Sequence, residues 1–167
     1  WSHRKNIGTP LDTGSMLMIA EFDPVHPERL ISEPKCLSRP LYGFENTEHT
    51  INNEGPYAFY YHNKIYLAYS GGDARGYLYA IGMLTANDGD DLCDLSVWEK
   101  AKTPIASFAT IPGEYGPGHN SFFWDRDQNL WIAYHAVTSF EEKIVSSGMR
   151  RVYFEQDKTP RFDVIVE

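Results

Sequence analysis

The sequence is poor in basic residues and in cysteine, and it has no long apolar run. Its 15 Lys and Arg stand against 23 Asp and Glu, which gives a formal net charge of −8. Such a surface repels a phosphate backbone, so we expect no nucleic acid among the partners. No stretch approaches the roughly 18 consecutive apolar residues that span a bilayer, so we expect no membrane partner either. Cys36 and Cys93 form neither a disulfide framework nor a metal-ligand spacing.

The chain also lacks an initiator Met and a signal-like region. It opens with Trp1-Ser2-His3-Arg4, and such an opening indicates an internal position in a longer gene product. We therefore expect further polypeptide upstream of Trp1. The compartment, cytoplasmic or secreted, is left open.

A repeated pair of apolar segments is the main feature that the sequence does have. Residues 65–70 match residues 130–135 position by position in character. Each copy follows a short polar turn, and each turn follows an apolar segment (57–61 or 121–124) that comes after a Gly-Pro pair. Aromatic residues make up 14% of the chain, and they favour strands. Short strands, polar turns and no convincing amphipathic helix predict an all-β fold of antiparallel hairpins.

The spacing of the repeat predicts a β-propeller. A period of about 60 residues is long for the hairpins of a β-sandwich, which is the alternative, and suits a blade of four strands plus loops. Residues 1–2 resemble the end of an earlier copy. The third strand of the full copy is expected at 77–82, and strands of the last copy at 151–154 and 162–166. The chain thus supplies one incomplete blade, one full blade and one final blade.

An incomplete ring of blades exposes sheet edges and an apolar face. We therefore expect the missing N-terminal blades as a partner of this chain. They come from the same gene product or from another chain.

Glu54 is the candidate catalytic residue. It directly precedes Gly55-Pro56, the pair that opens a strand, and the start of each innermost propeller strand points into the central funnel. A carboxyl group in such a cleft of low dielectric keeps its proton near neutral pH. A general acid that protonates a leaving sugar oxygen must do this. For this segment taken alone, a solvated turn glutamate is the alternative.

Four segments in order resemble glycoside hydrolase family 43, over essentially the whole chain. They are Glu-Gly-Pro at 54–56, Tyr-Leu-Ala-Tyr-Ser-Gly at 66–71, Gly-Pro-Gly-His-Asn-Ser-Phe at 116–122 and Trp-Ile-Ala-Tyr-His-Ala at 131–136. The resemblance implies a five-bladed β-propeller, with residues 1–167 as the C-terminal part of a single catalytic domain. The chain then runs from part of blade three through blade five.

The resemblance also implies an inverting glycosidase with Glu54 as its general acid. In that family two aspartates on earlier blades work with the acid. One is the catalytic base, and the other tunes the pKa of the acid and orients it. No Asp of this chain lies in a segment that resembles theirs, so we expect the chain alone to be inactive. Inversion requires the base and the acid to lie roughly 6.5–9.5 Å apart, with a water between them.

Further site residues are predicted around this acid. The resemblance places His119 on the propeller axis, where it helps to hold one calcium ion, or a sodium ion or water instead; an ordinary turn histidine is the alternative. Calcium prefers oxygen ligands, so a single imidazole makes a weak site. The resemblance also implies that Arg150, near the start of a last-blade strand, binds a sugar hydroxyl or the carboxylate of the catalytic acid. Tyr115 and His135 are candidates to line the sugar pocket. We expect no organic cofactor.

The expected activity is that of an exo-acting α-L-arabinofuranosidase on oligo- or polysaccharides of the plant cell wall. A β-xylosidase of xylan degradation and an endo-arabinanase are alternatives, because the general acid does not distinguish between pentoses. From another class, a non-catalytic carbohydrate-binding propeller is the alternative, and a structural propeller without a sugar site is the third. The intact acid at Glu54 argues against the binding propeller.

Overall fold

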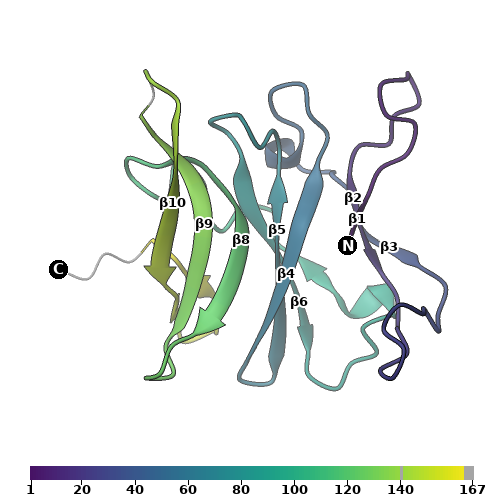
Figure 1. The fold of residues 1–167 in the computed structure, drawn as a ribbon. Helices are drawn as coiled ribbons and strands as arrows, with labels where there is room; N and C mark the ends of the chain where they lie inside the picture. Colours follow the sequence, from purple (N-terminus) through teal and green to yellow (C-terminus); the bar gives the residue numbers. More distant parts are fainter. Residues whose placement is uncertain (140, 164–167) are drawn as a thin grey trace.

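The computed structural model describes residues 1–139 and 141–163, and the regular structure among them is almost entirely β (Figure 1). The strands are β1 (Ser2–His3), β2 (Met16–Ile19), β3 (Lys35–Ser38), β4 (Asn53–Tyr61), β5 (Lys64–Gly71), β6 (Ala80–Asn87), β7 (Glu99–Lys100), β8 (Tyr115–Trp124), β9 (Leu130–Ser139), β10 (Ile144–Arg151), β11 (Tyr153–Phe154) and β12 (Pro160–Arg161). Two single 3₁₀ turns, η1 (Gly43–Glu45) and η2 (Leu95–Val97), are the helical elements of this part of the chain. None of its helices has the length and apolar character that crossing a membrane requires. The all-β prediction is confirmed.

Three sheets stand side by side in chain order (Figure 1). The first has the order β1-β2-β3, the second β4-β5-β6-β7 and the third β8-β9-β10, and neighbouring strands are antiparallel. A two-stranded ribbon of β11 and β12 follows the third sheet. The three sheets correspond in order to the three copies that the sequence repeat predicts.

The repeated hairpins form where the sequence predicts them. In the middle sheet β4 and β5 are joined by His62 and Asn63, both with positive φ (44° and 62°). Two consecutive residues of this kind make the tight turn that matches the twist of antiparallel strands. In the third sheet β8 and β9 are joined by a longer turn organised by Asp125, which accepts backbone hydrogen bonds from Asp127 and Asn129.

Apolar side chains join the sheets to each other. The larger core, between the second and third sheets, includes Tyr66, Ile81, Phe122 and Ile132. A smaller core between the first and second sheets contains Leu17, Tyr69 and Leu84 as its fully buried members. Each face of the middle sheet therefore packs against a neighbouring sheet.

Two of the expected strands are displaced. The third strand of the middle sheet is β6, which begins at Ala80 rather than at residue 77. The third strand of the last sheet is β10, which pairs with β9 and ends at Arg151, whereas residues 153–154 form β11 in the separate ribbon. Arg150 thus lies at the end of a strand and not at its start. The strand expected at 162–166 lies largely outside the described residues.

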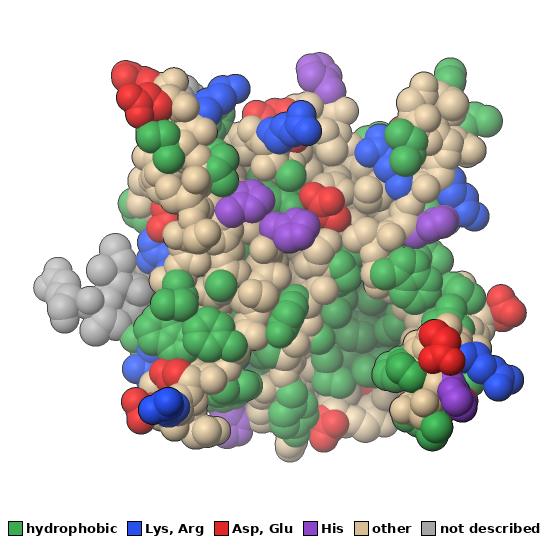
Figure 2. Space-filling view, viewed as in Figure 1, with side chains coloured by type: hydrophobic (Ala, Val, Ile, Leu, Met, Phe, Trp, Pro, Cys, Tyr) green, Lys and Arg blue, Asp and Glu red, His purple; other side chains and the backbone are tan. Residues whose placement is uncertain are grey.

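The group of three sheets has an apolar hollow on one side. Figure 2 shows hydrophobic side chains lining a depression between the middle sheet and the sheet of β1, β2 and β3. Its volume is about 300 Å³, and its lining includes Trp1, Leu17, Leu37, Ala58 and Leu67. Beside it β1, only two residues long, pairs with β2 and with no other strand of the described residues.

Candidate active site

The repeated Gly-Pro pair makes a β-bulge in both copies. Gly55 and Gly116 have φ of 55° and 58°, a left-handed conformation that glycine adopts without steric cost. The register shifts between Glu54 and Tyr57 in β4, and again on both sides of Gly118 in β8. A bulge bends its strand and re-aims the neighbouring side chain. The local sequence therefore fixes the direction in which Glu54 points.

A buried tyrosine holds the carboxyl group of Glu54. The hydroxyl of Tyr79 donates a hydrogen bond to Glu54 Oε1 at 2.8 Å. Tyr79 is fully buried, whereas Glu54 is partly exposed. Burial is the main reason that the pKa of Tyr79 is raised well above its ordinary value; a hydrogen bond from Ser70 lowers it somewhat, and the charge of Glu54 raises it further. Tyr79 therefore stays protonated and acts as a donor.

Two histidines complete the cluster. The ring of His135 lies parallel to the Tyr79 ring, with centroids 5.6 Å apart, and parallel to the His119 ring at 6.4 Å. The His119 ring also faces the Glu54–Gly55 bulge, because a Cβ on Gly55 would lie 3.6 Å from it. In Figure 2, histidine side chains gather beside an acidic side chain near the middle of the visible face.

Burial lowers the pKa of His135, and the neighbouring His119 lowers it further. A backbone hydrogen bond with Ala74 and the charge of Glu54 act in the opposite direction without reversing the shift. His135 is therefore neutral at neutral pH. The cluster can supply hydrogen bonds to a polar ligand beside the carboxyl group of Glu54.

A buried ionic network lies directly behind the strand that carries Glu54. Glu45 is fully buried and forms an ion pair with Lys100 at 2.5 Å. It also accepts hydrogen bonds from Tyr69 and from the side chain of Asn53, the residue before Glu54. Burial lowers the pKa of Lys100, and the contacts with Glu45 offset part of this shift. The network anchors the start of β4.

The profile of glycosyl hydrolases family 43 matches residues 6–160. The chain belongs to this family. The extracellular exo-alpha-(1->5)-L-arabinofuranosidase of Streptomyces avermitilis is 29% identical over 163 residues, which are 93% of this chain and 33% of that protein. The protein of the same name from Streptomyces chartreusis is 34% identical over 126 residues, 75% of this chain and 37% of that protein.

Family 43 structures share the fold. The crystal structure of alpha-L-arabinofuranosidase from Lactobacillus brevis superimposes with a TM-score of 0.79 at 30% identity, over 92% of this chain and 49% of that one. A thermostable family-43 glycoside hydrolase gives a TM-score of 0.71 at 26% identity. The chain spans about a third of the length of the curated relatives and about half of these solved chains.

In this family 43 chain, the contacts described for Arg150 and Tyr115 are with residues other than Glu54, His119 and His135. Arg150 donates to Glu114 at 2.7 Å and to the hydroxyl of Tyr134 at 2.8 Å. Because side chains alternate along a strand, Tyr134 and His135 point to opposite faces of β9. The ring of Tyr115 meets that of Tyr77 edge to face at 5.9 Å. The sugar-binding roles of Arg150 and Tyr115 stay predictions.

The described residues around His119 do not by themselves fit a calcium ion. Calcium takes six to eight oxygen ligands, and His119 offers a ring nitrogen. Next to it in sequence, Asn120 is buried, and neither polar atom of its side chain has a hydrogen-bond partner among the described residues. One imidazole and one amide oxygen are too few for the ion.

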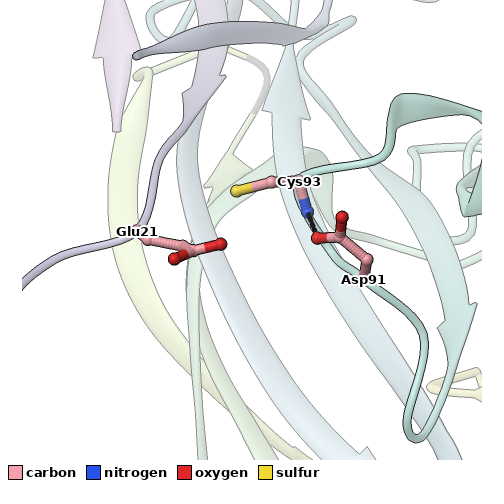
Figure 3. Close-up of side chains that lie close together, drawn as sticks. All are labelled: Glu21, Asp91 and Cys93. Atoms are coloured by element: carbon pink, nitrogen blue, oxygen red, sulfur yellow. Dashed lines mark hydrogen bonds between the residues drawn. The ribbon is translucent and has the colours of Figure 1, made fainter. Parts of the chain in front are cut away.

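A separate cluster lies at the rim of the first two sheets (Figure 3). Ligand atoms of Glu21, Asp91 and Cys93 lie within 4.8 Å of one another, and the thiol points toward the Glu21 carboxylate. Both carboxylates are exposed, and Asp91 already accepts the backbone N–H of Cys93. The ammonium group of Lys35 donates to the Cys93 carbonyl at 2.7 Å, so a positive charge already lies beside this cluster.

Sequence reasoning named three members of the site and missed two. Glu54, His119 and His135 are brought together as neighbours. Tyr79 falls in the strand expected at 77–82, where the repeat indicates no site role, and Glu45, in the 3₁₀ turn η1, lies outside the repeat. The one available signal for Tyr79 is the glycine at 118, which leaves space for its ring.

Proposed function

We propose that this chain is part of an inverting glycosidase that releases α-L-arabinofuranosyl units, with Glu54 as the general acid. The observation that carries the proposal is the setting of Glu54: one carboxyl oxygen is held by a buried tyrosine, beside two histidines. Membership of family 43 supports a glycosidase, and the names of the curated relatives favour arabinofuranosides. The xylosidase neighbour, at 14% identity, supports the fold alone.

In the proposed reaction Glu54 gives its proton to the glycosidic oxygen as the bond from that oxygen to the anomeric carbon breaks. A water molecule attacks the anomeric carbon from the opposite face, and its proton passes to a carboxylate base. Such a base lies roughly 6.5–9.5 Å from the acid in inverting enzymes. We propose that the base, and the residue that orients the acid, are aspartates of blades outside this chain.

The remaining blades are the proposed partner of residues 1–167. The apolar hollow beside β1 supports this, because an exposed hollow lined by Trp1, Ala58 and Leu67 is a surface that soluble proteins cover. With them the molecule is a five-bladed β-propeller, and this chain supplies blades three in part, four and five. An axial ion or water near His119 is part of the same proposal.

The test is Glu54→Gln in the full-length protein that contains this chain. Gln keeps the size of the side chain and removes its acidic proton, so hydrolysis of an arabino-oligosaccharide should fall by about 10²-fold or more. An aryl arabinofuranoside with a good leaving group needs less protonation and should lose less. Inversion is read from the anomeric configuration of the first product by NMR.

Glu99→Gln, a matched change at an exposed glutamate on β7, is the control and should leave both rates unchanged. Equal losses on the two substrates in Glu54→Gln would contradict the acid role. A full-length protein that binds arabinosides and hydrolyses none would instead favour the carbohydrate-binding propeller. Comparing aryl arabinofuranoside with aryl xyloside separates the arabinofuranosidase from the xylosidase.

A further inference from the structure

The hydroxyl of Tyr79 donates a hydrogen bond to the proposed acid, and Ser70 lies beside this hydroxyl. The backbone N–H of His119 donates to Ser70 Oγ at 2.7 Å. The side chain of Ser70 lies close enough to the Tyr79 hydroxyl to lower its pKa, and this hydroxyl donates to Glu54 Oε1 at 2.8 Å.

We propose that Tyr79 is a second positioning residue of the general acid, supplied by this chain in addition to the aspartate of the other blades: it holds Oε1 of Glu54, so that the acidic proton is carried by Oε2. This inference rests on the proposed function. An oxygen that accepts the Tyr79 hydrogen bond serves as the carbonyl oxygen of the protonated acid. The O–H group is then on the other oxygen, in one fixed orientation toward the leaving group.

The same bond assists the proton transfer. A hydrogen bond to a carboxylate is stronger than one to a neutral carboxylic acid. As Oε2 loses its proton to the glycosidic oxygen, negative charge spreads to Oε1, and the bond from Tyr79 strengthens. An interaction that gains strength along the reaction accelerates it.

Packing holds Tyr79 in this position. Its ring is stacked on His135 and fills the space that Gly118 leaves open, because a Cβ on residue 118 would overlap the ring. Tyr79 and Ser70 are both fully buried. Burial keeps water away from the hydroxyl, so its donor function does not depend on solvent.

The experiment is Tyr79→Phe in the full-length protein, with the pH dependence of kcat/KM as the main measurement. Phe has no hydroxyl to donate, so the ionised form of Glu54 loses a stabilising hydrogen bond. The alkaline limb of the pH profile of kcat/KM should therefore move to higher pH by about one unit. On an arabino-oligosaccharide kcat should fall by about tenfold with KM little changed, and the loss on an aryl arabinofuranoside should be smaller. Ser70→Ala, which removes the hydroxyl group that lies beside Tyr79, should shift the limb in the same direction and less.

Tyr69→Phe is the matched control. Tyr69 is equally buried and also donates to a glutamate, Glu45, at 2.8 Å, so this variant loses a comparable bond without touching Glu54. It should lower stability and leave the alkaline limb in place. An unmoved limb in Tyr79→Phe, or an equal shift in Tyr69→Phe, would overturn the inference.

The outcome with Glu54→Gln separates the two proposals. If Glu54→Gln hydrolyses the arabino-oligosaccharide at the unaltered rate, the proposed function itself fails. If Glu54→Gln is inactive and Tyr79→Phe keeps the original pH profile, only the positioning role of Tyr79 fails. If Tyr79→Phe does not fold, the Ser70→Ala profile decides the question.

Discussion

Gly118 and Tyr79 fit together because residue 118 has no side chain: a Cβ there would overlap the tyrosine ring. The second glycine of the Gly-Pro-Gly-His segment thus has a steric role, which is to admit a ring from the loop before β6. That ring in turn reaches Glu54. One packing contact therefore connects the sequence motif in β8 to the carboxyl group in β4.

Gly118→Ala should displace Tyr79 and weaken its bond to Glu54. Overpacking of this kind costs about 1–3 kcal/mol, so we expect a lower melting temperature together with a loss of hydrolysis greater than the loss of folded protein. Gly43→Ala is the control, since a Cβ on Gly43 meets nothing within 4 Å, and its effect should stay within about 0.5 kcal/mol. Equal melting temperatures for the two variants would contradict the packing argument.

The buried Glu45–Lys100 pair predicts a large stability effect. Glu45→Gln leaves the ammonium group of Lys100 without its counter-charge, and breaking a buried pair costs about 3–5 kcal/mol. Denaturant unfolding measures this loss. Adding Lys100→Met removes the unpaired charge, so the double variant should recover part of the stability. Glu28→Gln, in the exposed pair with His26, should cost about 1 kcal/mol or less.

The strands of the two hairpins were predictable because their signals are local. Gly-Pro, an apolar run, a polar turn and a second run lie within about 20 consecutive residues, and both copies fold accordingly. The position of Glu54 at the start of a strand was predictable for the same reason, since it adjoins the bulge. The sheets and their order follow from the period of the repeat.

Tyr79 and Glu45 were not predictable, because long-range folding creates their partners. Glu45 stands in a polar loop, Gly-Phe-Glu-Asn, that resembles a solvated turn, yet the structure buries it completely. Its burial depends on Lys100, far along the chain. Similarly, the apolar run at 77–82 predicts a strand, but β6 begins three residues later because Tyr79 turns inward to Glu54.

Asp125 makes stability depend on pH at the acidic end. Hydrogen bonds from the indole of Trp131 and from Asn129 lower its pKa from 3.8 to about 2. A lowered carboxyl pKa contributes stability that is present above about pH 4 and is lost as the pH falls toward 2. Asp125→Asn should therefore reduce the melting temperature at pH 6 and flatten its decline between pH 4 and 2. Asp127→Asn, in the same turn, is the control and should keep the decline of the original protein.

The His119–His135 pair predicts how one histidine titrates. Burial first, and then the charge of His119, lower the pKa of His135, whereas the charge of Glu54 raises it. His119→Asn should therefore raise the pKa of His135, and Glu54→Gln should lower it. Asn suits position 119, where φ is 51°, because it tolerates the left-handed conformation. NMR of ¹³C-labelled imidazoles in the full-length protein measures both shifts. Shifts of the same sign in the two variants would mean that a change in burial, rather than charge, governs this site.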